Sequence, residues 1–242
     1  MSPLGLLTDY PGSHTIWIAD DQALDYYALL SVYDSTRNST ALNLAQQMNS
    51  SMVKWGGFYE YWNPVFEVFG SYPETTQVTC GTDQSINVTQ GYAIDATVFK
   101  SCPGFQYSLF ADLLAYHVLL DVQFKNYTGA ESEFSKLSGM WDGHGFSDQP
   151  FQMDSTHTYQ SYKLADYVIA WKALANDSAT GQFALGYQTT AQSVAAVMSE
   201  LQSSAGGVWT GYRVSNGQIS YGSGISLTNG ETTSLFIFAT EG

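Results

Sequence analysis

Four aspartates stand where carboxylates could perform acid–base chemistry. Asp20 and Asp21 are adjacent, whereas Asp112 and Asp166 each interrupt a segment that is otherwise apolar. Paired carboxylates can divide the roles of acid and base, because one negative charge raises the pKa of its neighbour. A carboxylate in apolar surroundings needs hydrogen bonds or a partner, and such sites often have shifted pKa values. We therefore take Asp20, Asp21, Asp112 and Asp166 as the candidate catalytic residues.

Each of these aspartates also has a purely structural interpretation. Asp20 and Asp21 could cap free N–H groups at a helix start, where the helix dipole favours negative charge. Adjacent helical residues point about 100° apart, so at most one of the two would face a given substrate. Asp112 and Asp166 could instead lie on a polar stripe that faces solvent or a tyrosine hydroxyl, and Lys163, three residues before Asp166, supports that alternative.

Large aromatic residues form a second candidate set, because they cluster in loops and helix approaches. Their flat faces could stack on the apolar faces of sugar rings along a groove. The alternative is that they fill irregular loop cores, with Trp N–H groups bonded to the backbone. The candidate substrate-binding residues are Trp17, Trp55, Tyr59, Trp62, Trp141, Trp209 and Tyr212.

Helices must position these side chains. Four segments have polar starts and apolar bodies with helical spacing, and they predict helices over about 20–33, 106–122, 158–175 and from 229 to the end. Three more amphipathic helices are expected near 40–53, 129–139 and within 185–203. Asn216-Gly217 predicts a β-hairpin turn. The polar helix starts would gather at one rim of stacked helical hairpins, where chemistry or ligand binding would sit.

Residues 54–104 break this helical pattern. The segment is aromatic and rich in glycine, and we expect an irregular insertion with short strands. Cys80 and Cys102 bracket part of it. A disulfide between them would stabilise the fold by roughly 3 kcal/mol through the entropy of the unfolded chain. Two free buried thiols are the alternative.

Composition excludes several classes of function. Charged residues make up 12% of the 242-residue chain, and the net charge is −14 with only 8 Lys and Arg. Nucleic-acid binding needs cationic side chains, so that partner is excluded, and an anionic membrane surface is disfavoured. No phosphate-binding, dinucleotide-binding or serine-hydrolase motif occurs, and the histidines show no metal-ligand spacing, so we predict no cofactor and no metal. No apolar run is long enough to span a membrane.

Three features favour an extracellular or cell-surface protein. The charge is low, the cysteines form an even pair, and five Asn-x-Ser/Thr sequons offer glycosylation sites. The predicted glycosylation sites are Asn38, Asn49, Asn87, Asn126 and Asn176.

Two segments carry a resemblance to a known class. Residues 17–24, Trp-Ile-Ala-Asp-Asp-Gln-Ala-Leu, resemble a helix start in (α/α)-toroid glycosidases such as endo-mannanases and unsaturated glucuronyl hydrolases. Residues 229–235, Asn-Gly-Glu-Thr-Thr-Ser-Leu, resemble the Glu-Thr-Thr helix start of the wider toroid class. The resemblance implies a toroid-like (α/α) arrangement and glycosidase activity. A complete toroid has more helices and a longer chain than this sequence offers.

We therefore expect one mostly α domain over 1–242, with helical hairpins in a toroid-like arrangement and 54–104 as an irregular, disulfide-closed insertion. The leading hypothesis is hydrolysis of glycosidic bonds in an oligosaccharide or polysaccharide by a pair of carboxylates beside an aromatic groove. One alternative is a non-catalytic glycosylated surface or filament-forming protein that self-associates. Another is a lectin-like binding module.

Overall fold

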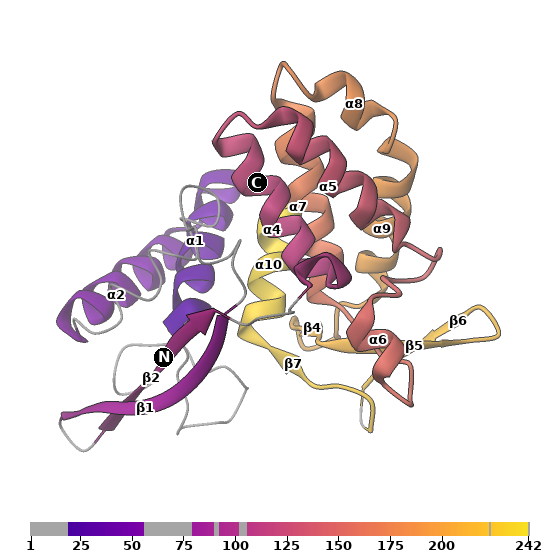
Figure 1. Cartoon of the computed structure of the whole chain (residues 1–242). Helices are drawn as coiled ribbons and strands as arrows, with labels where there is room; N and C mark the ends of the chain where they lie inside the picture. The colour runs from indigo at the N-terminus through magenta and orange to yellow at the C-terminus, as the bar shows by residue number, and fades with distance from the viewer. Residues whose placement is uncertain (1–18, 56–78, 90–91, 102–105, 223, 242) are drawn as a thin grey trace.

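The computed structural model supports a mostly helical chain with few strands, as predicted (Figure 1). The backbone is described for residues 19–55, 79–89, 92–101, 106–222 and 224–241, and side chains for 25–51, 106–222 and 224–240.

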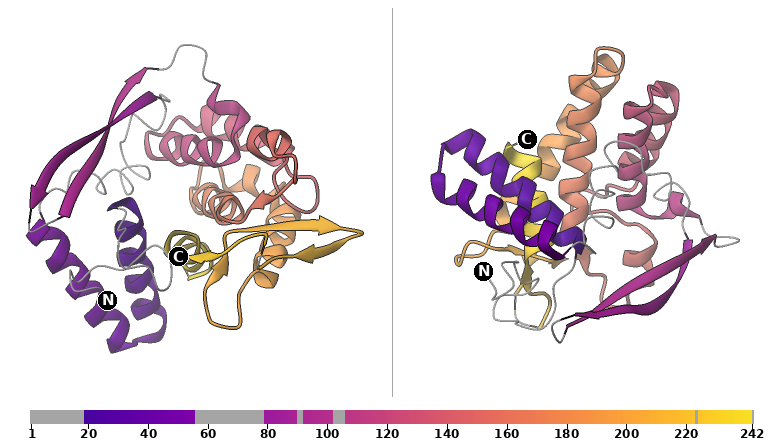
Figure 2. Two further views of the ribbon diagram at one scale, coloured as in Figure 1. Left: turned by 90° about the horizontal axis from the view of Figure 1, so that it is seen from below. Right: turned by 90° about the vertical axis from the view of Figure 1, so that its left-hand side faces the viewer.

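The four predicted helices with polar starts all form, and they pack against one another in a row. Helix α10 (Gly230–Glu241) lies between α1 (Ala19–Thr36) and α7 (Tyr162–Asn176), and α7 packs in turn on α4 (Ala111–Gln123). The first and last described helices are therefore neighbours, which Figure 2 shows from below (left). This packing makes neighbours of helices that are far apart in the sequence.

Further helices pack on this row. Helix α2 (Ser39–Trp55) covers α1, and α5 (Tyr127–Gly139) covers α4. Helices α8 (Gly181–Leu185) and α9 (Gln188–Glu200) both pack on α7. Short connections join α1 to α2 and α4 to α5, as antiparallel neighbours require.

The segment predicted to be irregular contains a long hairpin. Strands β1 (Thr79–Thr89) and β2 (Tyr92–Ser101) pair antiparallel, with one shift of register between Ser85 and Asn87. The prediction of short strands was therefore wrong for residues 79–101. The threonines, valines and isoleucines of this segment favour an extended ladder, and no tight-turn dipeptide marks the reversal. Cys102 lies outside the described residues, so the Cys80–Cys102 disulfide stays a prediction.

Short strands connect the later helices. Strand β5 (Gly211–Ser215) pairs with β6 (Gln218–Ser220) through Asn216 and Gly217, whose φ angles of 52° and 75° are those of the predicted hairpin turn. Strand β5 also pairs with β3 (Tyr159–Gln160), and β4 (Val208–Trp209) pairs with β7 (Thr228–Asn229). The helix predicted from residue 158 therefore starts too early, because its first residues join β5 instead.

Other boundaries also differ from the sequence pattern. The helix predicted over 106–122 divides into a 3-10 turn, η2 (Tyr107–Leu109), and α4, because Phe110 between them is extended. Helices α6 (Gln149–Met153) and α8 were not predicted. Each has five residues, which is too short for a helical period to be recognised.

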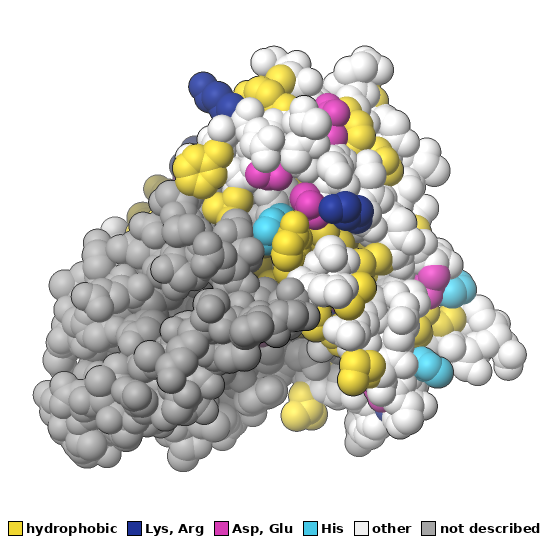
Figure 3. Space-filling view, in the orientation of Figure 1, with side chains coloured by type: hydrophobic (Ala, Val, Ile, Leu, Met, Phe, Trp, Pro, Cys, Tyr) yellow, Lys and Arg dark blue, Asp and Glu magenta, His cyan; other side chains and the backbone are white. Residues whose placement is uncertain are grey.

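Among the side chains that Figure 3 colours, charged ones are sparse, in keeping with the composition. Over the part of the chain that the structure describes, no helix has the length and hydrophobicity needed to cross a membrane.

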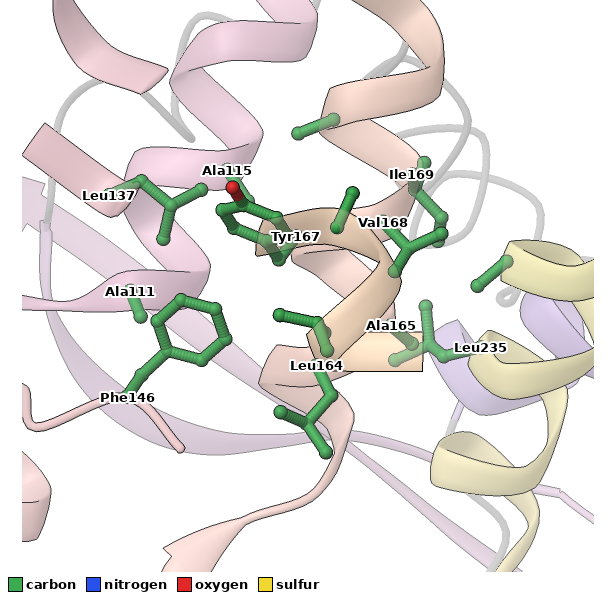
Figure 4. Close-up of a cluster of buried hydrophobic side chains, with 14 of the residues drawn as sticks. Ala111, Ala115, Leu137, Phe146, Leu164, Ala165, Tyr167, Val168, Ile169 and Leu235 are labelled. Atoms are coloured by element: carbon green, nitrogen blue, oxygen red, sulfur yellow. The ribbon is translucent and has the colours of Figure 1, made fainter. Parts of the chain in front are cut away.

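Helix α7 is the centre of the main core. Figure 4 shows its Leu164, Tyr167 and Val168 among side chains from α4, α5 and α10. Every residue from 163 to 170 is buried, so no face of this part of the helix meets water. A helix of this kind is normally apolar all round. The two exceptions in α7 are Lys163 and Asp166, and they lead to the candidate site.

Candidate functional site

The starts of three helices bring together a group that we call the carboxylate cluster. It contains three carboxylates with two tyrosines and one lysine. Asp112 is the second residue of α4, and Glu231 is the second of α10. The members are Asp112 and Tyr116 of α4, Tyr162, Lys163 and Asp166 of α7, and Glu231 of α10.

Asp166 is the most deeply buried carboxylate of the cluster. Its residue is 2% exposed, and its Oδ2 atom has no hydrogen-bond partner within the described residues. Burial raises the pKa of Asp166 well above the ordinary value, and the negative charges of Asp112 and Glu231 raise it further. Lys163 opposes this shift. Asp166 therefore keeps its proton to a higher pH than an exposed aspartate does.

Asp112 lies in a different environment. The Tyr162 hydroxyl donates a hydrogen bond of 3.2 Å to its Oδ2 atom, and the Lys163 Nζ atom lies 3.7 Å from its Oδ1 atom. Its side chain remains 19% exposed. Burial and the nearby Asp112 charge raise the pKa of Tyr162, so its hydroxyl stays protonated and remains a donor. Asp112 is thus a carboxylate with donors on one side and access from solvent.

Lys163 connects the cluster to a second buried carboxylate. Its Nζ atom lies 2.5 Å from the Oδ2 atom of Asp148, and the two side chains are 2% and 1% exposed. Asp148 also accepts hydrogen bonds from the backbone N–H groups of Ala111 (3.0 Å) and Phe151 (3.3 Å). The interpretation of Lys163 as part of a solvent-facing stripe is therefore wrong, since the ion pair with Asp148 lets the lysine be buried with its charge compensated.

Helix α1 contributes a buried carboxylate where it meets α10. Asp25 is 4% exposed and accepts a hydrogen bond from the Ser234 hydroxyl. A Cβ atom built on Gly230 would lie 3.3 Å from the same carboxylate, so the glycine permits a close approach of the two helices. Asp20 and Asp21 stand at the start of α1, but their side chains lie outside those described.

The candidate aromatic residues divide into three groups. Trp17, Tyr59 and Trp62 lie outside the described residues, and Trp55 ends α2 with its side chain outside them. Tyr212 is fully buried: its ring stacks on Tyr159 and its hydroxyl donates to the backbone oxygen of His144. No face of this ring is open, so we leave Tyr212 out of the proposed groove. Trp141 and Trp209 remain partly exposed.

A pocket of about 470 Å³ lies next to the buried ion pair. Trp141 lines it together with Asp142, Gln149 and Gln152, and Asp148 forms part of its wall. This mixture of one aromatic ring with carboxylates and amides, and a volume in the range of small-molecule sites, suits a polar ligand with an apolar face. Trp209 lies elsewhere and stacks on the exposed Tyr221, with ring centroids 5.7 Å apart.

The predicted glycosylation sites with described side chains, Asn38, Asn49, Asn126 and Asn176, are all exposed. The Asn126 side chain also accepts a hydrogen bond from the N–H group of Gly129 at the start of α5 and donates one to Asp121. Asn87 belongs to β1, and its side chain lies outside those described.

Sequence reasoning selected Asp112 and Asp166, which the structure brings together, but it missed Glu231, Lys163 and Asp148. Glu231 lay in the motif that carried the resemblance and was not selected as an acid. Lys163 was interpreted as part of a solvent-facing stripe, although a lysine within an apolar helix is unusual in a chain with so few cations. Asp148 gave no local signal, since its partners are distant in sequence.

Within the described ranges, no group of three or more His, Cys, Asp or Glu side chains is arranged to hold a metal ion. Comparison with protein-family models, curated proteins and solved structures found no match to this chain. The geometry of the cluster therefore carries the functional argument.

Proposed function

We propose that this protein hydrolyses glycosidic bonds outside the cell, with a pair of carboxylates drawn from Asp112, Asp166 and, at the start of α1, Asp20 and Asp21. The observation that carries the proposal is the contrast between two neighbouring aspartates. Asp166 is buried with a raised pKa, whereas Asp112 is partly exposed, accepts a hydrogen bond from Tyr162 and lies near the ammonium of Lys163. Glycoside hydrolysis requires this combination of one protonated acid and one carboxylate.

Asp112 and Asp166 have different roles in this proposal, because their surroundings differ. Asp112 is the carboxylate that a sugar would contact, because 19% of its side chain is exposed. Asp166 lies behind it and keeps its proton to a higher pH than an exposed aspartate, since burial and two negative neighbours disfavour its charged form and raise its pKa.

The pocket that Asp148 helps to line, beside its ion pair with Lys163 of the cluster, supports a carbohydrate ligand. Trp141 offers a flat apolar face, and Gln149, Gln152 and Asp142 offer donors and acceptors to hydroxyl groups. Trp141 and Trp209 remain in the proposed aromatic groove, together with the predicted residues that the structure does not describe.

The helical packing supports, as a further part of the proposal, a toroid-like (α/α) arrangement. The row α1–α10–α7–α4 would be the inner wall, and α2, α5 and α9 would belong to the outer layer. The exposed sequons Asn38, Asn49, Asn126 and Asn176 support glycosylation and an extracellular location.

The test is release of new reducing ends from plant, fungal and bacterial polysaccharides between about pH 3 and about pH 8. We expect the wild type to act on at least one of them, and Asp166→Asn to lose at least about 100-fold in rate. Asp34→Asn is the matched control, because this carboxylate is 74% exposed and pairs with Arg37 at the surface.

Two other outcomes would replace the proposal. Saturable binding of a polysaccharide without release of reducing ends would identify a lectin-like module. A folded protein that neither binds nor cleaves any of them, and that forms regular assemblies, would favour the structural surface protein.

A further inference from the structure

We propose that Lys163, which forms a buried ion pair with Asp148, is the positioning residue of the carboxylate cluster. It sets the pH range in which the Asp112–Asp166 pair is active. This inference rests on the proposed hydrolytic function. It assigns a role to two buried charged residues that do not act on the substrate themselves.

The ion pair is oriented with its positive end toward the cluster. Lys163 places its ammonium 2.5 Å from Asp148 and 3.7 Å from Asp112, so it lies between the two carboxylates. On α7, Lys163 precedes Asp166 by three residues, which is about one helical turn. One buried cation therefore acts on both members of the proposed pair.

Asp148 fixes this cation and the helix that carries Asp112. Its carboxylate accepts the N–H group of Ala111, the first residue of α4, and Asp112 is the next residue. The same carboxylate accepts the N–H group of Phe151 and pairs with Lys163 of α7. Asp148 thus joins the start of α4 to α7 at the point where Asp112 and Asp166 meet.

The remaining charged and titratable groups around the pair do not duplicate this role. Lys163 is the only cation among the cluster members, and every other group is acidic or neutral. The groups that face the pair are Tyr116 of α4, Tyr162 and Lys163 of α7, Glu231 of α10, and Asp148 at the start of α6.

The test compares pH–rate profiles of kcat/KM for the wild type, Lys163→Met and Asp148→Asn on the polysaccharide that the wild type cleaves best. Without the ammonium, the charged forms of the nearby carboxylates are less favoured, so both limbs of the Lys163→Met profile should move to higher pH by about one unit. Its rate at the wild-type optimum should fall about tenfold or more.

Asp148→Asn should move the profile in the opposite direction. The two N–H groups of Ala111 and Phe151 bond to different oxygens of Asp148, so this variant keeps an acceptor for one of them and removes the negative charge behind Lys163. The cluster then faces an uncompensated ammonium, and both limbs should move to lower pH. A purely structural role would not produce shifts of opposite sign. Lys172→Met is the control, because Lys172 lies on the same helix and contacts the backbone oxygen of Thr240.

The outcomes separate this inference from the proposed function. An active wild type whose profile is unchanged in both variants, or shifted the same way in both, would overturn the role of Lys163 and leave the hydrolase intact. If Lys163→Met does not fold, an acid shift in Asp148→Asn still supports the role, and an unshifted profile overturns it. A folded but inactive wild type would overturn both.

Discussion

Replacing Lys163 by methionine should destabilise the protein strongly. The substitution nearly preserves the length of the side chain but leaves the 1%-exposed Asp148 carboxylate without its cation. Breaking a buried ion pair from one side typically costs about 3–5 kcal/mol. Two backbone N–H groups still bond to Asp148, so we expect the lower end, about 3 kcal/mol. For a chain of this size that corresponds to a fall in Tm of roughly 6–12 °C.

Thermal unfolding followed by far-UV circular dichroism measures this effect, and a double-mutant cycle isolates the pair. Asp148→Asn should cost less than Lys163→Met, because Asp112 remains as a second carboxylate 3.7 Å from the ammonium. The double variant should lose less free energy of unfolding than the two single variants together, by at least about 1 kcal/mol. The reason is that it leaves neither Lys163 nor Asp148 as an unpaired buried charge. Lys172→Met should stay within about 0.5 kcal/mol of the wild type. Additive effects, or a Tm change below about 2 °C for Lys163→Met, would refute the reasoning.

Three further variants test other parts of the structure. Because the pKa of Asp166 is raised on folding, its carboxyl favours the folded state below the unfolded pKa of about 3.9 and loses that contribution as the pH rises. The Tm of Asp166→Asn should therefore rise relative to that of the wild type as the pH increases above about 4, and a Tm difference that does not change with pH would contradict this. Gly145→Ala should cost about 2–3 kcal/mol in denaturant unfolding, since the new Cβ would lie 2.2 Å from the Tyr159 ring. Gly139→Ala, with nothing within 4 Å, should instead gain up to about 1 kcal/mol, and equal effects of the two substitutions would argue against the packing described.

The sequence predicted best what is decided locally. Polar starts followed by apolar bodies identified α1, α4, α7 and α10, because burial of one helix stripe leaves a periodic pattern. Asn216-Gly217 identified the β5–β6 hairpin, because both residues must adopt positive φ and these two types do so readily.

Contacts between distant residues were not predictable in the same way. Lys163 and Asp166 are three residues apart on a helix, a spacing equally typical of a solvated surface pair. Lys163 and Asp166 are buried because α7 packs between α4 and α10 and because Asp148, from another segment, pairs with Lys163. Neither contact can be read from the spacing in the sequence. The pairing of Tyr159 and Gln160 with β5 likewise depends on residues about fifty positions later.

The carboxylates of the cluster also divide into those with a local signal in the sequence and those without one. Asp112 and Asp166 were chosen because a charge within an apolar segment demands an explanation, and the structure brings both into one cluster. Glu231 completes the cluster from the other end of the described chain. Its charge acts on Asp166 only because α10 packs against α7, and no spacing within the sequence records that contact.

The most direct test of the central claim is the rate at which Asp112→Asn releases reducing ends from the best polysaccharide, compared with Asp34→Asn. Asp112 is the partly exposed carboxylate of the cluster, and Asn keeps its size and an acceptor for Tyr162 while removing the charge. We predict that Asp112→Asn loses at least about 1000-fold in this rate at unchanged Tm, because it removes a catalytic carboxylate. Asp34→Asn should keep the wild-type rate. Wild-type turnover in a folded Asp112→Asn variant would contradict the account.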